Sequence, residues 1–297
     1  MPVDSTHKQY QDSVAKWQLV RDCVAGADTV RNQGETYLPH PDKTAEDAAQ
    51  RYLDYNSRAQ YVNVLARTRN AMVGMAFRKP PVMELPAQLE YLIENASGDG
   101  LSLEQLAKNT VGDLLETGRY GLLADYPIAE EGQSAAQTQS ITASIKAYKP
   151  ESIINWSATV INGQSVLSQV VLRETIETST DGFESVESYQ YRVLKLVDNI
   201  YTIELWKDGD VIGTAEPRQA NGSRFNFIPF IIAGAVSNDP SVDNAALYDI
   251  AELNIGHYRN SADYEESVFL VGQPQPVIAG LSQSWLDSAG GSYKYGS

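Results

Sequence analysis

The chain has 297 residues, 42% of them hydrophobic, which is enough to bury one large core or two modest ones. Its net charge of -15 argues against a protein that wraps nucleic acid tightly, because such proteins carry a basic face. The single cysteine, Cys23, excludes an intrachain disulfide and a cysteine-rich metal site. The polar N-terminus and the lack of a long apolar run predict a chain that starts soluble and cytoplasmic, with no membrane partner.

The first part of the chain is predicted to be helical. Apolar residues recur every three or four positions from Tyr10 through Trp17 to Val24, which predicts an amphipathic helix ending at Gly26. A polar, proline-containing linker follows at residues 38–41.

Thr44 is expected to cap a second, long helix that ends by Lys79, because Pro80 and Pro81 follow. We expect one face of this helix to carry Tyr52, Tyr55, Ala59, Val62, Ala66, Val73 and Ala76. A third helix is predicted to begin at Ser102, with Gln105 completing a capping box, and to end at Gly118.

After Arg119 the pattern changes to alternation and to β-branched and aromatic residues, which are typical of strands. The predicted strand segments are Ser140–Trp156, Val166–Ile176, Val186–Trp206 and Phe225–Val236. Tight turns are predicted at Asn162-Gly163, Asp181-Gly182, Asp208-Gly209 and Asn221-Gly222. This arrangement predicts an antiparallel meander and no nucleotide-binding crevice of the doubly wound kind.

A long helix is predicted to follow the strands. Asp243 is expected to cap it, and it runs to about Val271, before Gly272 and two prolines. Its inner stripe is predicted to contain Ala246, Leu247, Ile250, Leu253, His257, Ala262 and Val268 or Phe269.

Motifs of catalysis, phosphate binding or zinc binding are missing from the sequence, so we expect no enzyme activity, no cofactor and no metal. The three histidines lie near the N-terminus (His7), in the proline-rich linker (His40) and on the inner stripe of the long helix (His257), which are poor settings for a general base. A carboxylate-based hydrolase on the meander stays open as a distant alternative.

Charges are segregated along the chain. The predicted second helix is locally basic, with Arg51, Arg58, Arg67, Arg69 and Arg78. The predicted long helix is acidic, with Asp249, Glu252, Asp263, Glu265 and Glu266. Two solvated faces would explain this pattern. Complementary surfaces between copies, with an acidic lining that repels the DNA backbone, would explain it as well.

Several phrases, in their order, resemble the portal proteins of tailed double-stranded DNA phages, in particular a podophage-type family first catalogued as a domain of unknown function. None of the phrases is a catalytic signature. They lie at residues 37–41, 52–61, 74–80, 114–127, 148–156, 228–230 and 253–263, as in Leu114-Leu-Glu-Thr-Gly-Arg-Tyr-Gly and Leu253-Asn-Ile-Gly-His-Tyr.

The resemblance implies an α+β fold in which a helical part (residues 1–125) and an antiparallel β part (126–236) form a wing. A stem helix (237–271) would follow and contribute to the channel lining, and a clip would begin in residues 272–297. The family pattern continues with a second stem helix, a tunnel loop and a crown, which we do not expect within these residues.

The resemblance also implies a dodecameric ring at one capsid vertex, through which DNA passes during packaging and ejection. Its implied partners are further copies of the chain, major capsid and scaffolding proteins, terminase, a head-tail adaptor and double-stranded DNA bound without sequence specificity. Its implied location is the virion, and the host cytoplasm during assembly. The main alternative is another structural protein of a phage tail or baseplate, which would lack a closed ring with a DNA-sized hole.

The acidic run generates a first prediction. Replacing Glu265 and Glu266 with lysine should slow DNA movement more than it harms folding, because added cations would hold passing phosphates. Packaging by the double variant, compared with wild type, measures the effect. Equal packaging would show that these residues do not line the channel.

Overall fold

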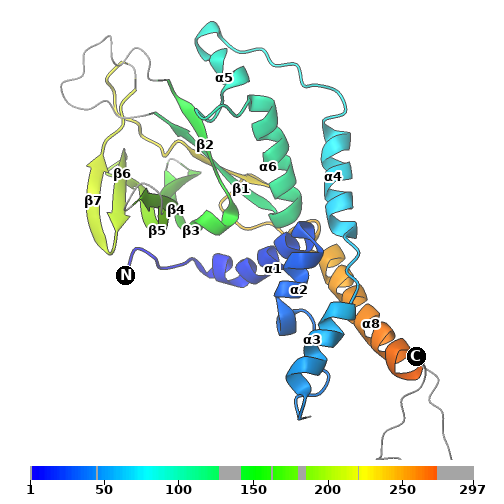
Figure 1. Cartoon of the computed structure of the whole chain (residues 1–297). Coiled ribbons are helices and arrows are strands. Elements are labelled where there is room, and N and C mark those ends of the chain that lie inside the picture. Colours follow the sequence, from blue (N-terminus) through cyan, green and yellow to red (C-terminus); the bar gives the residue numbers. More distant parts are fainter. Residues whose placement is uncertain are drawn as a thin grey trace, which may run out of the picture.

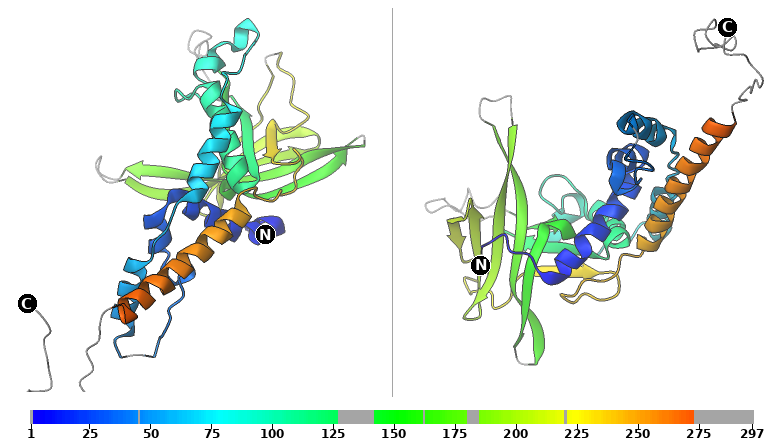
Figure 2. Two further views of the ribbon diagram at one scale, coloured as in Figure 1. Left: turned by 90° about the vertical axis from the view of Figure 1, so that its right-hand side faces the viewer. Right: turned by 90° about the horizontal axis from the view of Figure 1, so that it is seen from below.

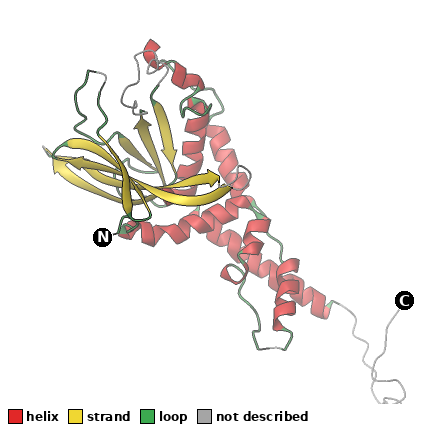
Figure 3. Ribbon diagram, turned by 60° about the vertical axis from the view of Figure 1, so that its left-hand side comes forward, coloured by secondary structure: helices red, strands yellow, loops and turns green. Residues whose placement is uncertain are grey.

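The computed structural model describes residues 2–44, 46–126, 142–161, 163–179, 185–219 and 221–272. Helices come first, antiparallel sheets occupy the middle, and a long helix closes the described part, which confirms the predicted α+β class (Figure 1). Figure 3 shows the strands gathered on one side of the molecule and the helices on the other. The predicted clip, from residue 273 onward, lies outside the described residues.

The N-terminal helix follows its prediction. Helix α1 (Lys8–Ala25) buries Tyr10, Trp17 and Val20, and it ends at Gly26, whose positive φ and N–H bond to the Asp22 carbonyl close the helix. His7 is held in place before the helix, because its N–H donates to the Ile154 carbonyl and its ring stacks on Trp156, 4.0 Å between centroids. The start of α1 is therefore fixed to a sheet.

The single long helix predicted up to Lys79 is wrong. The chain forms two helices, α3 (Ala48–Arg58) and α4 (Val64–Ala76), separated by an extended stretch. In that stretch Tyr61 is buried and donates its hydroxyl to the Cys23 carbonyl (2.8 Å), while the Asn63 side chain caps α4 by accepting from the Ala66 N–H. Thr44 is not a cap; Asp47 holds the cap position of α3, without a side-chain bond.

The third helix is confirmed as α6 (Leu103–Thr117), with the capping box of Ser102 and Gln105 and left-handed Gly118 at its end. Among the described residues before α6, four short helical segments fall outside the predictions: α2 (Ala27–Asn32), η1 (Gly34–Thr36), η2 (Ala87–Leu89) and α5 (Tyr91–Glu94).

The described strands form two antiparallel sheets. The three-stranded sheet has the order β2-β1-β8, and the five-stranded sheet is the meander β3-β4-β5-β6-β7. Strand β1 falls outside the four predicted segments. It pairs with β2, so the predicted boundary between the helical part and the β part, after residue 125, separates two strands of one sheet. The bounds are β1 (Arg119–Asp125), β2 (Ser144–Tyr148), β3 (Ile153–Ile161), β4 (Gln164–Ser179), β5 (Ser185–Val197), β6 (Ile200–Lys207), β7 (Asp210–Ala215) and β8 (Phe230–Gly234).

Two predicted segments are each two strands. The segment 140–156 is divided by the 3-10 turn η3 (Pro150–Ser152), which moves the chain from one sheet to the other. The segment 186–206 is divided by a two-residue turn at Asp198 and Asn199, with φ of 50° and 61°. Both residue types tolerate this left-handed conformation, so the turn needs no glycine.

The predicted hairpin turns fare unevenly. Asp208 and Gly209 link β6 to β7 with positive φ, as expected, and Gly163 and Gly222 also have positive φ. The Asp181-Gly182 turn lies outside the described residues, as does Asn162.

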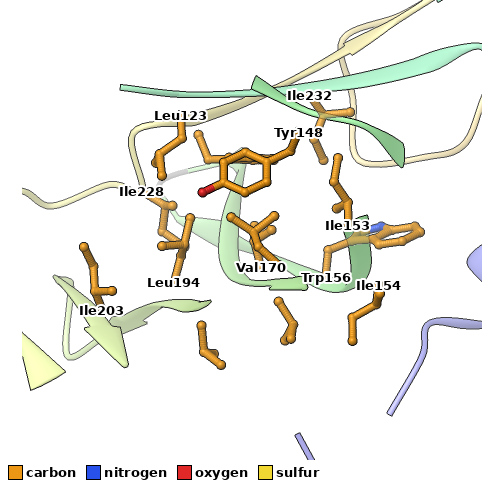
Figure 4. Close-up of a cluster of buried hydrophobic side chains, with 14 of the residues drawn as sticks. Leu123, Tyr148, Ile153, Ile154, Trp156, Val170, Leu194, Ile203, Ile228 and Ile232 are labelled. Atoms are coloured by element: carbon orange, nitrogen blue, oxygen red, sulfur yellow. The ribbon is translucent and has the colours of Figure 1, made fainter. Parts of the chain in front are cut away.

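Buried side chains form two clusters that share one helix. The sheet cluster gathers residues from both sheets, including Leu123, Tyr148, Val170 and Leu194, which converge in Figure 4. The helical cluster joins α1, α3, α4 and the last helix. Tyr10 and Trp17 of α1 belong to the first cluster, and Val20 and Cys23 belong to the second. Helix α1 thus connects the two halves.

The close packing of the sheets generates a second prediction. A Cβ on Gly121 would lie 2.5 Å from Phe230 Cζ and 2.8 Å from Ile153 Cδ1. Gly121→Ala should therefore lower the free energy of unfolding by about 1–3 kcal/mol, as overpacked cores do. Gly74→Ala is the control, because its Cβ meets nothing within 4 Å and it lies inside α4, where alanine stabilises by about 0.5–1 kcal/mol. Urea unfolding of both variants measures the changes, and equal effects would contradict the packing argument.

Candidate functional site

The acidic long helix is the candidate site, and it begins later than predicted. Helix α8 spans Tyr248–Val271, with Leu247 at the cap position and no side-chain cap bond. Asp243 instead accepts from the backbone N–H groups of Val236 (2.7 Å) and Ser237 (3.1 Å). Its carboxylate closes the loop after β8, so the predicted capping role is wrong.

One face of α8 packs on the helical cluster. Ala251, Ile255, Tyr258 and Ala262 are buried there. Leu253 and His257, predicted on the inner stripe, are exposed, Leu253 to 74%. Leu247 and Ala262 of the predicted stripe are buried, so the prediction is right in part, but it misplaces Leu253 and His257 because α8 carries apolar residues on both faces. The buried face also includes a polar residue, Asn254, which donates to the Val62 carbonyl (3.0 Å).

Hydrogen bonds from tyrosines fasten α8 to α3. The Tyr55 hydroxyl donates to Asp263 Oδ1 and the Tyr258 hydroxyl to Asn56 Oδ1, each at 2.6 Å. Burial, together with the Asp263 carboxylate, raises the pKa of Tyr55, so its hydroxyl remains a donor at neutral pH. These bonds fix the rotation of α8 about its own axis.

The five acidic residues predicted to line a channel divide into two groups. Three lie toward α3: Asp263 accepts from Tyr55, Glu265 accepts from the Gln60 side chain (3.1 Å), and Glu266 forms a partly buried ion pair with Arg58. Asp249 and Glu252 are exposed in the first two turns of α8, where Glu252 accepts from the Tyr248 hydroxyl (2.7 Å). Because Glu266 balances Arg58, lysine there would also weaken the docking of α3 on α8.

The five basic residues do not form one face. Arg58 forms an ion pair with Glu266, and its guanidinium lies over the Phe269 ring, 4.4 Å from the ring centroid. Arg69 bonds Glu116 of α6 through Nε (2.8 Å). Arg51, Arg67 and Arg78 are exposed and remain available to a partner.

A buried ion cluster, absent from the predictions, joins α1 to α6 and to η3. Arg21 contacts Glu116 (2.5 Å), Glu151 (2.9 Å) and Asp113. Burial raises the pKa of the Asp113 carboxyl, and the Arg21 guanidinium opposes that shift. The sequence does contain a signal for this cluster. Arg21 lies four residues after Trp17, so it is a charged residue on the apolar face of α1.

The opposite face of α8 carries large exposed apolar residues among polar ones. Leu253, Tyr264 and Val271 are 74%, 67% and 83% exposed, and they lie along one line of the helix. An open hollow on this face is lined by Asp249, Glu252, Leu253, Gly256, His257 and Asn260. Figure 2 shows α8 running along the edge of the helical group, away from the five-stranded sheet.

Within the described ranges, no group of three or more His, Cys, Asp or Glu side chains could hold a metal ion. None of the helices in those ranges combines the length and the apolar character that crossing a bilayer requires. Neither Asp113 nor Glu116 lines the hollow on α8 or the hollow around Met83 to Glu94.

Comparison with known proteins gives one family match. The model of a family described as Domain of unknown function (DUF4055) matches residues 246–291, which include all of α8. No curated protein matches the chain. The match thus falls on the segment that carries the candidate surface.

The ion cluster generates a third prediction. Arg21→Ala should lower the free energy of unfolding by about 3–5 kcal/mol, because it leaves buried carboxylates without their cation. Lys8→Ala is the control: it removes an exposed pair with Asp12 on the same helix and should cost at most about 0.5 kcal/mol. Denaturant unfolding followed by circular dichroism compares them. Similar losses in both variants would show that the cluster does not stabilise the fold.

Proposed function

We propose that this chain is a phage portal subunit, which assembles into a ring-shaped channel at one capsid vertex for genome packaging and ejection. The observation that carries the proposal is α8, a 24-residue helix whose inner face packs on the helical cluster and whose outer face exposes Leu253, Tyr264 and Val271. A large exposed apolar surface on a soluble protein usually marks an interface. Such a helix suits a stem that packs against copies of itself.

The arrangement of the parts supports the same proposal. The sheets lie on the side of the helical group away from α8, so they can project outward as a wing while α8 lies nearer an axis (Figures 1 and 2). The family match falls on the proposed stem and on the residues directly after it. In this proposal the wing contacts capsid and scaffolding proteins, and the clip docks the terminase and later the head-tail adaptor.

The charge of the chain fits a channel that lets DNA slide. A net charge of -15 disfavours retention of phosphates, so DNA would pass without sequence-specific contacts. The subunit itself needs no catalytic group in this proposal, because the separate terminase hydrolyses ATP. Its location would be the virion, and the host cytoplasm before that.

A structural role in a phage tail or baseplate is the second candidate. The exposed face of α8 favours any assembly of this kind, since it requires a partner but does not specify closure. The two candidates differ in the assembly that they predict. A portal must form a closed ring whose central hole encloses duplex DNA, whereas a tail or baseplate protein need not.

Negative-stain electron microscopy with mass photometry on the purified chain tests the proposal. The expected result is closed rings of about twelve copies around a hole wide enough for a duplex, since repeated heterologous contacts close into rings. Arg21→Ala, in which the buried ion cluster is lost and the fold is destabilised, should form fewer rings than Lys8→Ala. Monomers at micromolar concentration, or closed particles without a hole, would contradict the proposal.

A further inference from the structure

The outer face of α8, defined by Asp249, Leu253, Gly256, Asn260, Tyr264 and Val271, has the spacing of a helix-packing seam. Successive members lie three, four or seven residues apart, so they form one narrow stripe. Buried residues of α8 lie on the opposite side. The seam has no partner within the described part of the chain.

Gly256 makes a socket in this seam. Leu253, Gly256, His257 and Asn260 occupy positions i, i+3, i+4 and i+7, which is the four-residue arrangement that receives a side chain from a facing helix. A Cβ on Gly256 would meet nothing within 4 Å, so the space above the backbone is open. The socket is flanked by Asp249 and Glu252, which makes its rim acidic.

A second seam with matching properties lies on α4. The outer face of α4 is defined by Val64, Arg67, Ala71 and Met75, again three or four residues apart, and Arg78 follows two residues after the end of the helix. All five are exposed, and Met75 most clearly, at 68%. The residues that anchor α4 to the rest of the chain lie on its other side: Leu65 is buried in the core, and Arg69 pairs with Glu116.

The two seams are complementary. Methionine is a flexible side chain that fills irregular sockets, and Met75 lies between the cations Arg67 and Arg78. Copies of a chain with a net charge of -15 repel each other unless opposite charges meet locally. The outer face of α4 offers cations, and the outer face of α8 offers Asp249 and Glu252.

We propose that the outer face of α4 in one copy packs on the outer face of α8 in a second copy, with Met75 in the socket over Gly256. Arg67 and Arg78 then meet the acidic rim. The contact joins two different patches, so it can repeat from copy to copy. This inference rests on the proposed function for its role, because it names the contact that would build the ring.

Cysteine cross-linking between two separately purified variants tests the contact. Met75→Cys and Gly256→Cys chains, mixed under mild oxidation, should give disulfide-linked dimers, whereas each variant alone should give few. The native Cys23 is buried, and burial raises the pKa of its thiol to about 11, so it stays unreactive. Efficient cross-linking of Met75→Cys alone would indicate that α4 packs on α4, and no cross-linking in the mixture would overturn the inference.

Charge reversal gives an independent readout. Asp249→Lys with Glu252→Lys should weaken self-association by about tenfold, and so should Arg67→Glu with Arg78→Glu, because like charges would face each other. Combining all four changes should restore assembly. The control is Glu187→Lys with Asp210→Lys, two exposed carboxylates on the sheet, which should leave assembly unchanged.

The outcomes separate this contact from the portal role. Rings without the mixed cross-link would leave the portal proposal standing and refute the α4–α8 contact. The mixed cross-link in closed dimers would support the contact and refute the ring. Normal assembly of the Asp249 and Glu252 variant, with slower DNA passage, would refute the contact and assign these two residues to the channel lining.

Discussion

The buried contacts of Arg21 are the constraint on which the rest of the structure depends. Three carboxylates, from α6 and from the turn η3 between the two sheets, converge on one guanidinium of α1. Removing such charges from water is costly unless each finds its counterpart, so the cluster admits few relative positions of these elements. Arg69 extends it to α4 through Glu116. The angle between the sheets and the helical group follows from this cluster.

Helix α1 transmits that constraint to α8. Its first half lies in the sheet cluster, and its second half lies in the helical cluster. There Asp22 accepts from the Tyr37 hydroxyl (2.7 Å), and the carbonyl of Tyr37 in turn accepts from Arg259 of α8 (2.6 Å). A chain of contacts therefore runs from the sheets through α1 to the long helix, so forces applied to the sheets reach α8 through packed and bonded elements.

The sequence predicts best where a signal is local. The capping box of α6 and the apolar stripe of α1 each use residues within a few turns, and both elements form as predicted. The break between α3 and α4 depends on Tyr61 reaching Cys23 of another helix, which no local pattern reveals. Tertiary contacts likewise decide which face of α8 is buried. Apolar residues lie on both faces of this helix, so their spacing alone does not identify the buried one. For the same reason the sequence identifies the candidate charged residues but does not show which of them pair within the chain and which stay exposed.

Sorting the charges changes what the acidic helix can do. Asp263, Glu265 and Glu266 serve the docking of α3, so the basic and acidic runs partly neutralise each other within one chain. What remains exposed is a smaller set of charges beside apolar residues on α8 and on α4. An apolar stripe gains about 25 cal/mol for each Å² removed from water, but that gain is not selective. The charges beside it supply selectivity, since they favour the pairing of unlike faces and oppose the pairing of like ones. The contact proposed between α4 and α8 joins two such unlike faces, so it can repeat from copy to copy.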